Sequence, residues 1–151
     1  MNNMQGKFPS TRLRRNRMKE FSRHLVAENT LSVNDLILPL FVCEGNKVDD
    51  PINSMPGVSR YSIDKLLNQV EKAVKFNIPA IAIFPQIESG LKNSEGSLAV
   101  DENNLVCRSI KSIKKDFPNI GIVCDVALDP FTDHGHCLLY TSDAADESVG
   151  V

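Results

Sequence analysis

The sequence has 151 residues, of which 42% are hydrophobic and 24% are charged, with a formal net charge of −2. These values fit one ordinary folded domain, or part of a larger one, and argue against a disordered chain. The longest apolar run, residues 36–43, is much shorter than the about 20 residues of a transmembrane helix. The N-terminus lacks the apolar segment of a secretory signal, and there is no Cys-x-x-Cys pair. We therefore expect a reduced, cytoplasmic protein that binds no membrane.

The charge is concentrated at the N-terminus. Residues 1–24 contain seven basic residues and one acidic residue, so they carry +6 and the remainder carries −8. Clustered arginines can neutralise nucleic-acid phosphates, but no aromatic residue stands among those at residues 12–17 for base stacking. We favour a solvated arm that docks on an acidic surface, such as a neighbouring subunit, over a nucleic-acid-binding segment.

The first half of the chain alternates between strand and helix patterns. Residues 36–43 indicate a strand, in which Pro39 must lie at a sheet edge or near the strand's start. Residues 44–60 are rich in turn-forming residues and predict a loop. Residues 62–77 have apolar side chains on one helical face, and we expect Ser62 to cap this helix through its hydroxyl.

The second half continues the alternation. Asn77 can adopt the left-handed conformation where the first helix ends, and residues 80–84 are apolar throughout, as in a strand buried on both faces. Residues 85–103 form a polar segment that is long enough to be an active-site loop. A helix at about 104–117 and a third strand at about 120–128 follow. This order implies a parallel sheet, either doubly wound or a (β/α) barrel.

The third strand contains the main candidate site. Alternation places Asp125 and Asp129 on one face with only Ala127 between them, and the other face is apolar. A carboxylate inside a strand is costly unless it is paired, and both barrels and open α/β sheets bind ligands at the carboxyl ends of their strands. We interpret the two aspartates as functional, although Asp129 also fits a simple turn before Pro130.

A cluster of possible metal ligands follows. His134, His136 and Cys137 combine with the upstream carboxylates into a mixed set of nitrogen, sulfur and oxygen donors. Oxygen ligands favour Mg²⁺ or Ca²⁺, whereas thiolate and imidazole favour Zn²⁺. The His-Gly-His segment fits an ordinary turn equally well.

Several motifs together resemble the δ-aminolevulinic acid dehydratase family, also called porphobilinogen synthases. They are RLRRN at residues 12–16, DLILPLFV at 35–42, SMPGV at 54–58, LVCRSI at 105–110 and CDVALDPFTDHGH at 124–136. The resemblance implies a lyase of tetrapyrrole and haem biosynthesis, which condenses two 5-aminolevulinate molecules to porphobilinogen. It also implies a (β/α)₈ TIM barrel and a homo-octamer.

The resemblance divides the chain into three parts. Residues 1–30 would form an N-terminal arm that wraps a neighbouring subunit, and residues 31–136 would form about three βα units of an incomplete barrel. Residues 137–151 resemble nothing in the family, and we expect an aberrant tail. The family's Schiff-base lysines lie on later strands, so we expect the chain to be inactive and poorly soluble.

The resemblance also assigns the candidate residues. Asp125 matches an active-site aspartate that contacts substrate, and Asp129 matches a position that replaces a metal ligand. Zinc-dependent members carry three cysteines here, whereas this sequence has Ala127 and Asp129 at the first two positions. We therefore expect magnesium rather than zinc in the parent protein. Asp129 and Cys137 are weak metal-ligand candidates, since most of the magnesium site would lie outside this chain.

Two alternatives remain open at this stage. Another metal-assisted (β/α)-barrel aldolase or hydrolase could use Asp125, Asp129 and His134. A non-enzymatic RNA-binding module could use the basic arm, and its affinity would fall steeply with salt.

Overall fold

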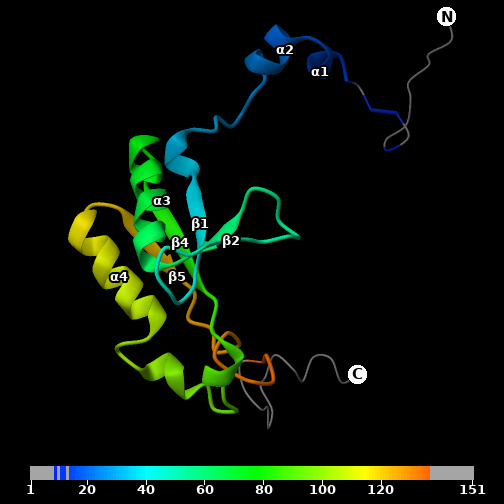
Figure 1. Ribbon diagram of the computed structural model, residues 1–151. Helices are drawn as coiled ribbons and strands as arrows, with labels where there is room; N and C mark the ends of the chain where they lie inside the picture. The colour runs from blue at the N-terminus through cyan, green and yellow to red at the C-terminus, as the bar shows by residue number, and fades with distance from the viewer. Residues whose placement is uncertain (1–8, 10, 13, 137–151) are drawn as a thin grey trace, which may run out of the picture. The chain divides into compact units, whose positions relative to one another are not determined.

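The computed structural model describes residues 9, 11–12 and 14–136, which fall into two compact units, Met1–Ser32 and Val33–Val151 (Figure 1). The first unit contains two short helices, α1 (Arg15–Met18) and α2 (Glu20–Leu25). None of its described residues is buried, so the described part of this unit has no hydrophobic core. No helix among the described residues has the length and apolar character needed to span a membrane.

The second unit is built on a five-stranded sheet in the order β2-β3-β1-β4-β5. The strands are β1 (Ile37–Val42), β2 (Asp49–Pro51), β3 (Ser59–Tyr61), β4 (Ala80–Pro85) and β5 (Gly121–Cys124). Strand β4 pairs in parallel with β1 on one side and with β5 on the other. Two helices, α3 (Ile63–Lys75) and α4 (Leu105–Asp116), join these strands, which confirms the expected β–α–β–α–β order.

The hydrophobic core lies between the sheet and the two helices, which pack side by side on one face (Figure 1). Side chains two apart in a strand share a face, and burial of apolar surface stabilises the face that the helices cover. The core residues are Leu40 and Val42 from β1, Ile81 and Ile83 from β4, Leu66, Val70 and Ala73 from α3, and Leu105 and Ile113 from α4. The opposite face is more open, and Ile37 and Val123 are exposed there.

The local signals for the first strand and for the end of α3 are confirmed, and the structure adds a cap at the start of α4. Strand β3 pairs with β1 only at Phe41 and Val42, so β1 is a sheet edge on that side at Pro39, as expected. Asn77 ends α3 in the left-handed conformation with φ of 57°. The side chain of Asn104 caps α4 by accepting a hydrogen bond of 2.9 Å from the backbone of Cys107.

The prediction of a loop at residues 44–60 is wrong in part. Strands β2 and β3 form an antiparallel pair there, with an ion pair of 2.9 Å between Arg60 and Asp50 across it. The segment has no apolar alternation because both strands are short and β2 is fully exposed. Hydrophobic periodicity cannot reveal such a hairpin.

The role predicted for Ser62 is also wrong. Ser62 stands at the N-cap position of α3, but its hydroxyl makes no capping hydrogen bond. The hydroxyl oxygen instead accepts from the backbone N–H of Val48 at 2.9 Å, and the hydroxyl donates to Asp64 at 2.6 Å. The backbone N–H of Lys47 donates to the same Asp64 carboxylate at 3.1 Å. These bonds fasten the turn after β1 to the start of α3.

Candidate functional site

The segments that follow β1, β4 and β5 meet at one edge of the sheet. All three strands run in the same direction, so their carboxyl ends lie together. The N–H of Gln86, directly after β4, donates to the carbonyl of Val42 at the end of β1, at 2.7 Å. Asp125 is the first residue after β5. The sheet edge at which α/β enzymes bind ligands therefore contains the first predicted site residue.

The predicted extent of the third strand is wrong. Strand β5 ends at Cys124 rather than near residue 128, because its hydrogen-bonded ladder with β4 ends at the pair Ile83–Cys124. Asp125 and Asp129 therefore do not share the face of one strand. Asp129 lies in a turn in which the N–H groups of Phe131 and Thr132 donate to the carbonyl of Leu128.

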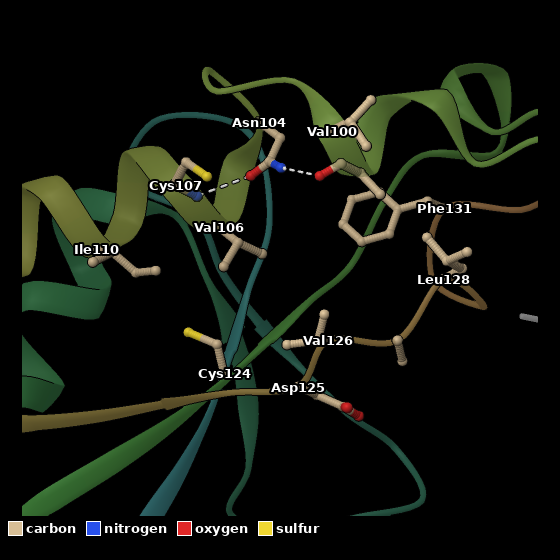
Figure 2. Close-up of a pocket in the computed structure, with 12 residues that line it drawn as sticks. Val100, Asn104, Val106, Cys107, Ile110, Cys124, Asp125, Val126, Leu128 and Phe131 are labelled. Atoms are coloured by element: carbon tan, nitrogen blue, oxygen red, sulfur yellow. Dashed lines mark hydrogen bonds between the residues drawn. The ribbon is translucent and has the colours of Figure 1, made fainter.

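Both aspartates are exposed, so Asp125 does not occupy a strand interior as expected. In Figure 2 the Asp125 carboxylate is directed away from Cys124 and from the neighbouring cavity. Exposure removes the desolvation cost that a carboxylate would have within a strand, so Asp125 does not need a buried partner. The arrangement offers solvent-accessible negative charge at the sheet edge.

The long loop after β4 is fastened to the turn after β5. Asn93 and Thr132 form an isolated parallel bridge, in which the N–H of Asn93 donates to the carbonyl of Phe131 and the N–H of Asp133 donates to the carbonyl of Asn93. The side-chain oxygen of Asn93 also accepts from the N–H groups of Glu95 and Ser97. The loop expected to serve the active site is thus held against the segment that carries Asp129.

Sequence reasoning missed Asn93 and Thr132. An Asn followed by Ser, Glu and Gly is a signal for a side-chain-stabilised turn, and it could have indicated the local bonds of Asn93. The bridge between Asn93 and Thr132 joins residues that are separated in the sequence by α4 and β5, so no local pattern indicates it. The same is true of the ion pair between Glu44, just after β1, and Arg108 on α4, two residues that are 64 positions apart.

The His-Gly-His segment acts as a turn. The Nδ1 atom of His134 accepts the backbone N–H of His136 at 3.2 Å, so the proton of the neutral ring lies on Nε2, which donates to the carbonyl of Ser94 at 3.2 Å. Both ring nitrogens are therefore engaged, and His134 has none left for a metal without rearrangement. The two imidazole rings are stacked with centroids 6.0 Å apart.

The described residues assemble no metal site. Residues 9, 11–12 and 14–136 contain no group of three or more His, Cys, Asp or Glu side chains placed to hold an ion. Cys137, the weak metal candidate, lies outside the described residues. Ala127 has no side-chain donor, so it adds no ligand to Asp129.

A cavity of about 340 Å³ lies beside the candidate site, between α4 and the segment that follows β5 (Figure 2). Its walls are mainly apolar and include the thiols of Cys107 and Cys124. Burial raises the pKa of the Cys124 thiol, and the charge of Cys107 raises it further. A raised pKa keeps a thiol protonated at neutral pH, so Cys124 lacks the activation of a catalytic nucleophile.

Comparisons with known proteins assign the chain to a family. The family model described as delta-aminolevulinic acid dehydratase matches residues 10–151. The chain belongs to the δ-aminolevulinic acid dehydratase family. Among its members, the protein of Bradyrhizobium diazoefficiens is 51% identical over 142 residues, which are 93% of this chain and 40% of that protein. The protein of Chlamydia pneumoniae is 42% identical over 94% of this chain and 43% of its own length.

A solved member of the family has the same fold over the matching region. The Toxoplasma gondii enzyme, crystallised with its reaction product porphobilinogen, is 37% identical, with a TM-score of 0.77 over 87% of this chain and 37% of that chain. The described fold is therefore part of a TIM barrel, as expected. The chain spans about 40% of the length of the curated relatives it matches. The family match includes residues 137–151, so it does not separate the expected aberrant tail from the family.

Proposed function

We propose that this chain forms part of a porphobilinogen synthase, a lyase that condenses two molecules of 5-aminolevulinate to porphobilinogen. The observation that carries the proposal is Asp125, which follows β5 directly at the carboxyl edge of a parallel sheet in a member of this family. The Toxoplasma gondii relative was crystallised in complex with porphobilinogen, its reaction product. No observation on the described residues favours the aldolase, hydrolase or RNA-binding alternatives over this function.

The exposed aspartates fit the charge of this substrate. 5-Aminolevulinate carries an ammonium group, and a carboxylate that accepts hydrogen bonds from an ammonium group forms one of the stronger polar contacts in proteins. We assign to Asp125 the binding and orientation of a substrate amino group. Asp129 lies in the adjoining turn, which Asn93 holds through backbone bonds to Phe131 and Asp133. A fixed turn keeps the second carboxylate in place at little entropic cost on binding.

The lysines of this chain do not fit a covalent role. A Schiff-base lysine needs a pKa lowered by burial or by a neighbouring cation. None of the lysines among the described residues is buried, and most are exposed on helices α3 and α4. We infer that the Schiff-base lysines of the enzyme belong to later strands of a longer chain and that residues 1–151 alone form no product.

For the longer enzyme we propose magnesium rather than zinc. Ala127 and Asp129 occupy positions where the zinc-dependent pattern has cysteine, and a carboxylate oxygen suits a hard cation better than a thiophilic one. The described donors do not by themselves fit a complete site for either ion. We therefore derive no catalytic step that uses a metal.

We also propose that residues 1–30 act as an arm that docks on a neighbouring subunit of a cytoplasmic homo-octamer, the assembly that the family resemblance implies. Phe21 and Leu25 are four residues apart on α2, Met18 is the last residue of α1, and all three side chains are largely exposed. Exposed apolar side chains of this kind gain stability when another surface covers them.

A chimera tests the proposed activity. Residues 1–136 of this chain would be joined to the remaining C-terminal part of the Bradyrhizobium diazoefficiens relative, and porphobilinogen formation would be measured. We expect turnover by the chimera and none by the 151-residue chain. We expect Asp125→Asn to reduce turnover by at least about 100-fold, the scale on which loss of a positioned catalytic contact acts.

Asp133→Asn provides a matched control, because Asp133 is another exposed aspartate of the same segment and its backbone makes the contact with Asn93. This variant should retain nearly all activity. A folded chimera that forms no porphobilinogen, or one in which the Asp125 and Asp133 variants are equally active, would contradict the proposal.

A further inference from the structure

Thr132 lies in the turn after β5, and the proposed function gives its side chain no role. Thr132 is only 1% exposed, although Asp129 and Asp133 on either side of it are exposed. A hydroxyl that is buried in this way costs free energy of desolvation unless it makes hydrogen bonds. The contacts of Thr132 therefore show what this residue holds in place.

The hydroxyl of Thr132 joins the two ends of the segment from Asp129 to His136. It donates to the carbonyl of His136 at 2.7 Å, and the carbonyl of Asp129 lies 3.4 Å from the same oxygen. The backbone N–H of Thr132 donates to the carbonyl of Leu128 at 3.2 Å. The carbonyls of Leu128 and Asp129 belong to the two peptide groups that flank the Cα atom of Asp129. Contacts with both groups restrict the backbone torsions that set the direction of the Asp129 side chain.

The methyl group of Thr132 contacts the long loop after β4. A Cβ atom at Gly96 would lie 3.4 Å from the methyl carbon of Thr132, so the backbone of the loop approaches this methyl group closely. Asn93, three residues earlier in the loop, forms the parallel bridge with Thr132. The side chain thus uses its hydroxyl within the turn and its methyl group against the loop. Serine lacks the methyl group, and valine lacks the hydroxyl.

We propose that Thr132 is a positioning residue for Asp129 in the substrate site, an inference that rests on the proposed function. The Asp129 side chain is exposed, so the place of its carboxylate depends on the backbone conformation of the turn. Thr132 fixes that conformation through its contacts on both sides of Asp129. A carboxylate that is held in one place before binding orients a substrate ammonium group at a lower entropic cost.

A double-mutant cycle in the chimera with the Bradyrhizobium diazoefficiens relative tests this role. Thr132→Val keeps the shape of the side chain but removes the hydroxyl, and we expect kcat/KM for porphobilinogen formation to fall by about 10-fold or more. Thr132→Ser retains the hydroxyl and should keep most of the activity. In the Asp129→Asn background the positioned carboxylate is missing. There Thr132→Val should change kcat/KM by less than about twofold, because two residues that act through one contact are not additive.

Ser109→Ala is the matched control. The Ser109 hydroxyl is buried like that of Thr132 and also donates to a backbone carbonyl, that of Leu105, at 2.7 Å, but it lies within α4 rather than in the turn. Loss of this bond should lower stability, as loss of the Thr132 bond does. It should nevertheless leave kcat/KM near the wild-type value.

Hydrogen–deuterium exchange of the same chimera provides a measurement that needs no turnover. The backbone N–H groups of Phe131 and Asp133 make the hydrogen bonds that hold the turn and the loop together. Both amides should exchange faster in Thr132→Val than in the wild type, because the turn opens more often without the hydroxyl. Ser109→Ala should leave both rates unchanged.

The outcomes separate this inference from the proposed function. A folded wild-type chimera that forms no porphobilinogen would overturn the proposed function, and with it the substrate role of Thr132. An active chimera would overturn the role of Thr132 alone in any of three cases. These are full activity of Thr132→Val, the same fold-loss with and without the Asp129 carboxylate, and unchanged exchange of the turn amides.

Discussion

Strands β4 and β5 have similar apolar sequences but very different surroundings. Strand β4 has a parallel neighbour on each side, and the side chains of Ile81 and Ile83 are 0% and 1% exposed. Strand β5 pairs with β4 alone among the described strands, and Val123 is 47% exposed. Two residues after β5 ends, Val126 is 97% exposed. The number of neighbouring elements, rather than the apolar pattern, decides which strand belongs to the core.

The same difference explains where the candidate site lies. Asp125 and Asp129 follow the strand with fewer neighbours, so they are accessible to solvent and to ligands. In a TIM barrel each strand pairs on both sides. We infer that later strands of a longer chain would cover the free side of β5 and enclose the two aspartates.

The largest expected effect contrasts the two strands directly. Ile83→Ala removes a fully buried side chain and should lower the free energy of unfolding by about 2–5 kcal/mol. Val123→Ala removes apolar atoms from an exposed face and should cost less than about 1 kcal/mol. Urea unfolding followed by far-UV circular dichroism measures both. Equal losses would show that β5 is as well packed as β4.

The helix that connects β4 to β5 should also respond at its start. Asn104→Ala removes the cap of α4 and should lower the free energy of unfolding by about 1 kcal/mol. Asn103→Ala is the matched control, because the Asn103 carbonyl that accepts from Arg108 remains in place. The same urea titration compares them, and a larger loss in the control would contradict the assigned cap.

A smaller effect, which should depend on pH, comes from Asp64, the residue that joins the turn after β1 to the start of α3. The hydrogen bond from Ser62 is the main cause that lowers the pKa of the exposed Asp64 carboxyl below 3.8. The ionised form therefore stabilises the fold above that pH, and its contribution is lost as the pH falls through the lowered pKa. The free energy of unfolding of Asp64→Asn should be lower than that of the wild type at neutral pH, and the difference between the two should shrink as the pH falls through this acidic range. A gap that widens below pH 3.8 would contradict the sign.

The smallest effect concerns thiol reactivity. Burial raises the pKa of both Cys43, beside β1, and Cys124, at the end of β5. Iodoacetamide alkylation of each, followed by peptide mass spectrometry, should require a pH higher than a free thiol does. Cys43 is buried and Cys124 is half-buried, so Cys43 should react more slowly. Faster alkylation of Cys43 than of Cys124 would contradict this prediction. It would mean that the end of the edge strand β5 is better protected than the end of the inner strand β1.

The sequence predicted those features that depend on local patterns. Apolar periodicity located α3, α4, β1 and β4, and the left-handed conformation of Asn77 followed from residue type. The end of β5 was misplaced because a strand lasts only as long as its ladder, and the ladder depends on a partner far along the chain.

The candidate site was predicted in part for the same reason. A site near the carboxyl end of the third strand could be inferred, but Asp125 follows β5 directly because the ladder with β4 ends at Cys124, and its exposure depends on what covers β5. The Asn93–Thr132 bridge and the Glu44–Arg108 ion pair join residues that are distant in sequence, so no local pattern predicts them. The role expected for Ser62 was wrong because Val48 and Asp64 compete for its hydroxyl.

Hydrogen–deuterium exchange of β4 and β5 tests the central claim most directly, namely that β5 is an open edge which a longer chain completes. In the 151-residue chain, amides of β5 should exchange faster than those of β4, since only one neighbour protects them. In the chimera with the Bradyrhizobium diazoefficiens relative, β5 should become as protected as β4. Equal protection of both strands in the 151-residue chain would contradict the account.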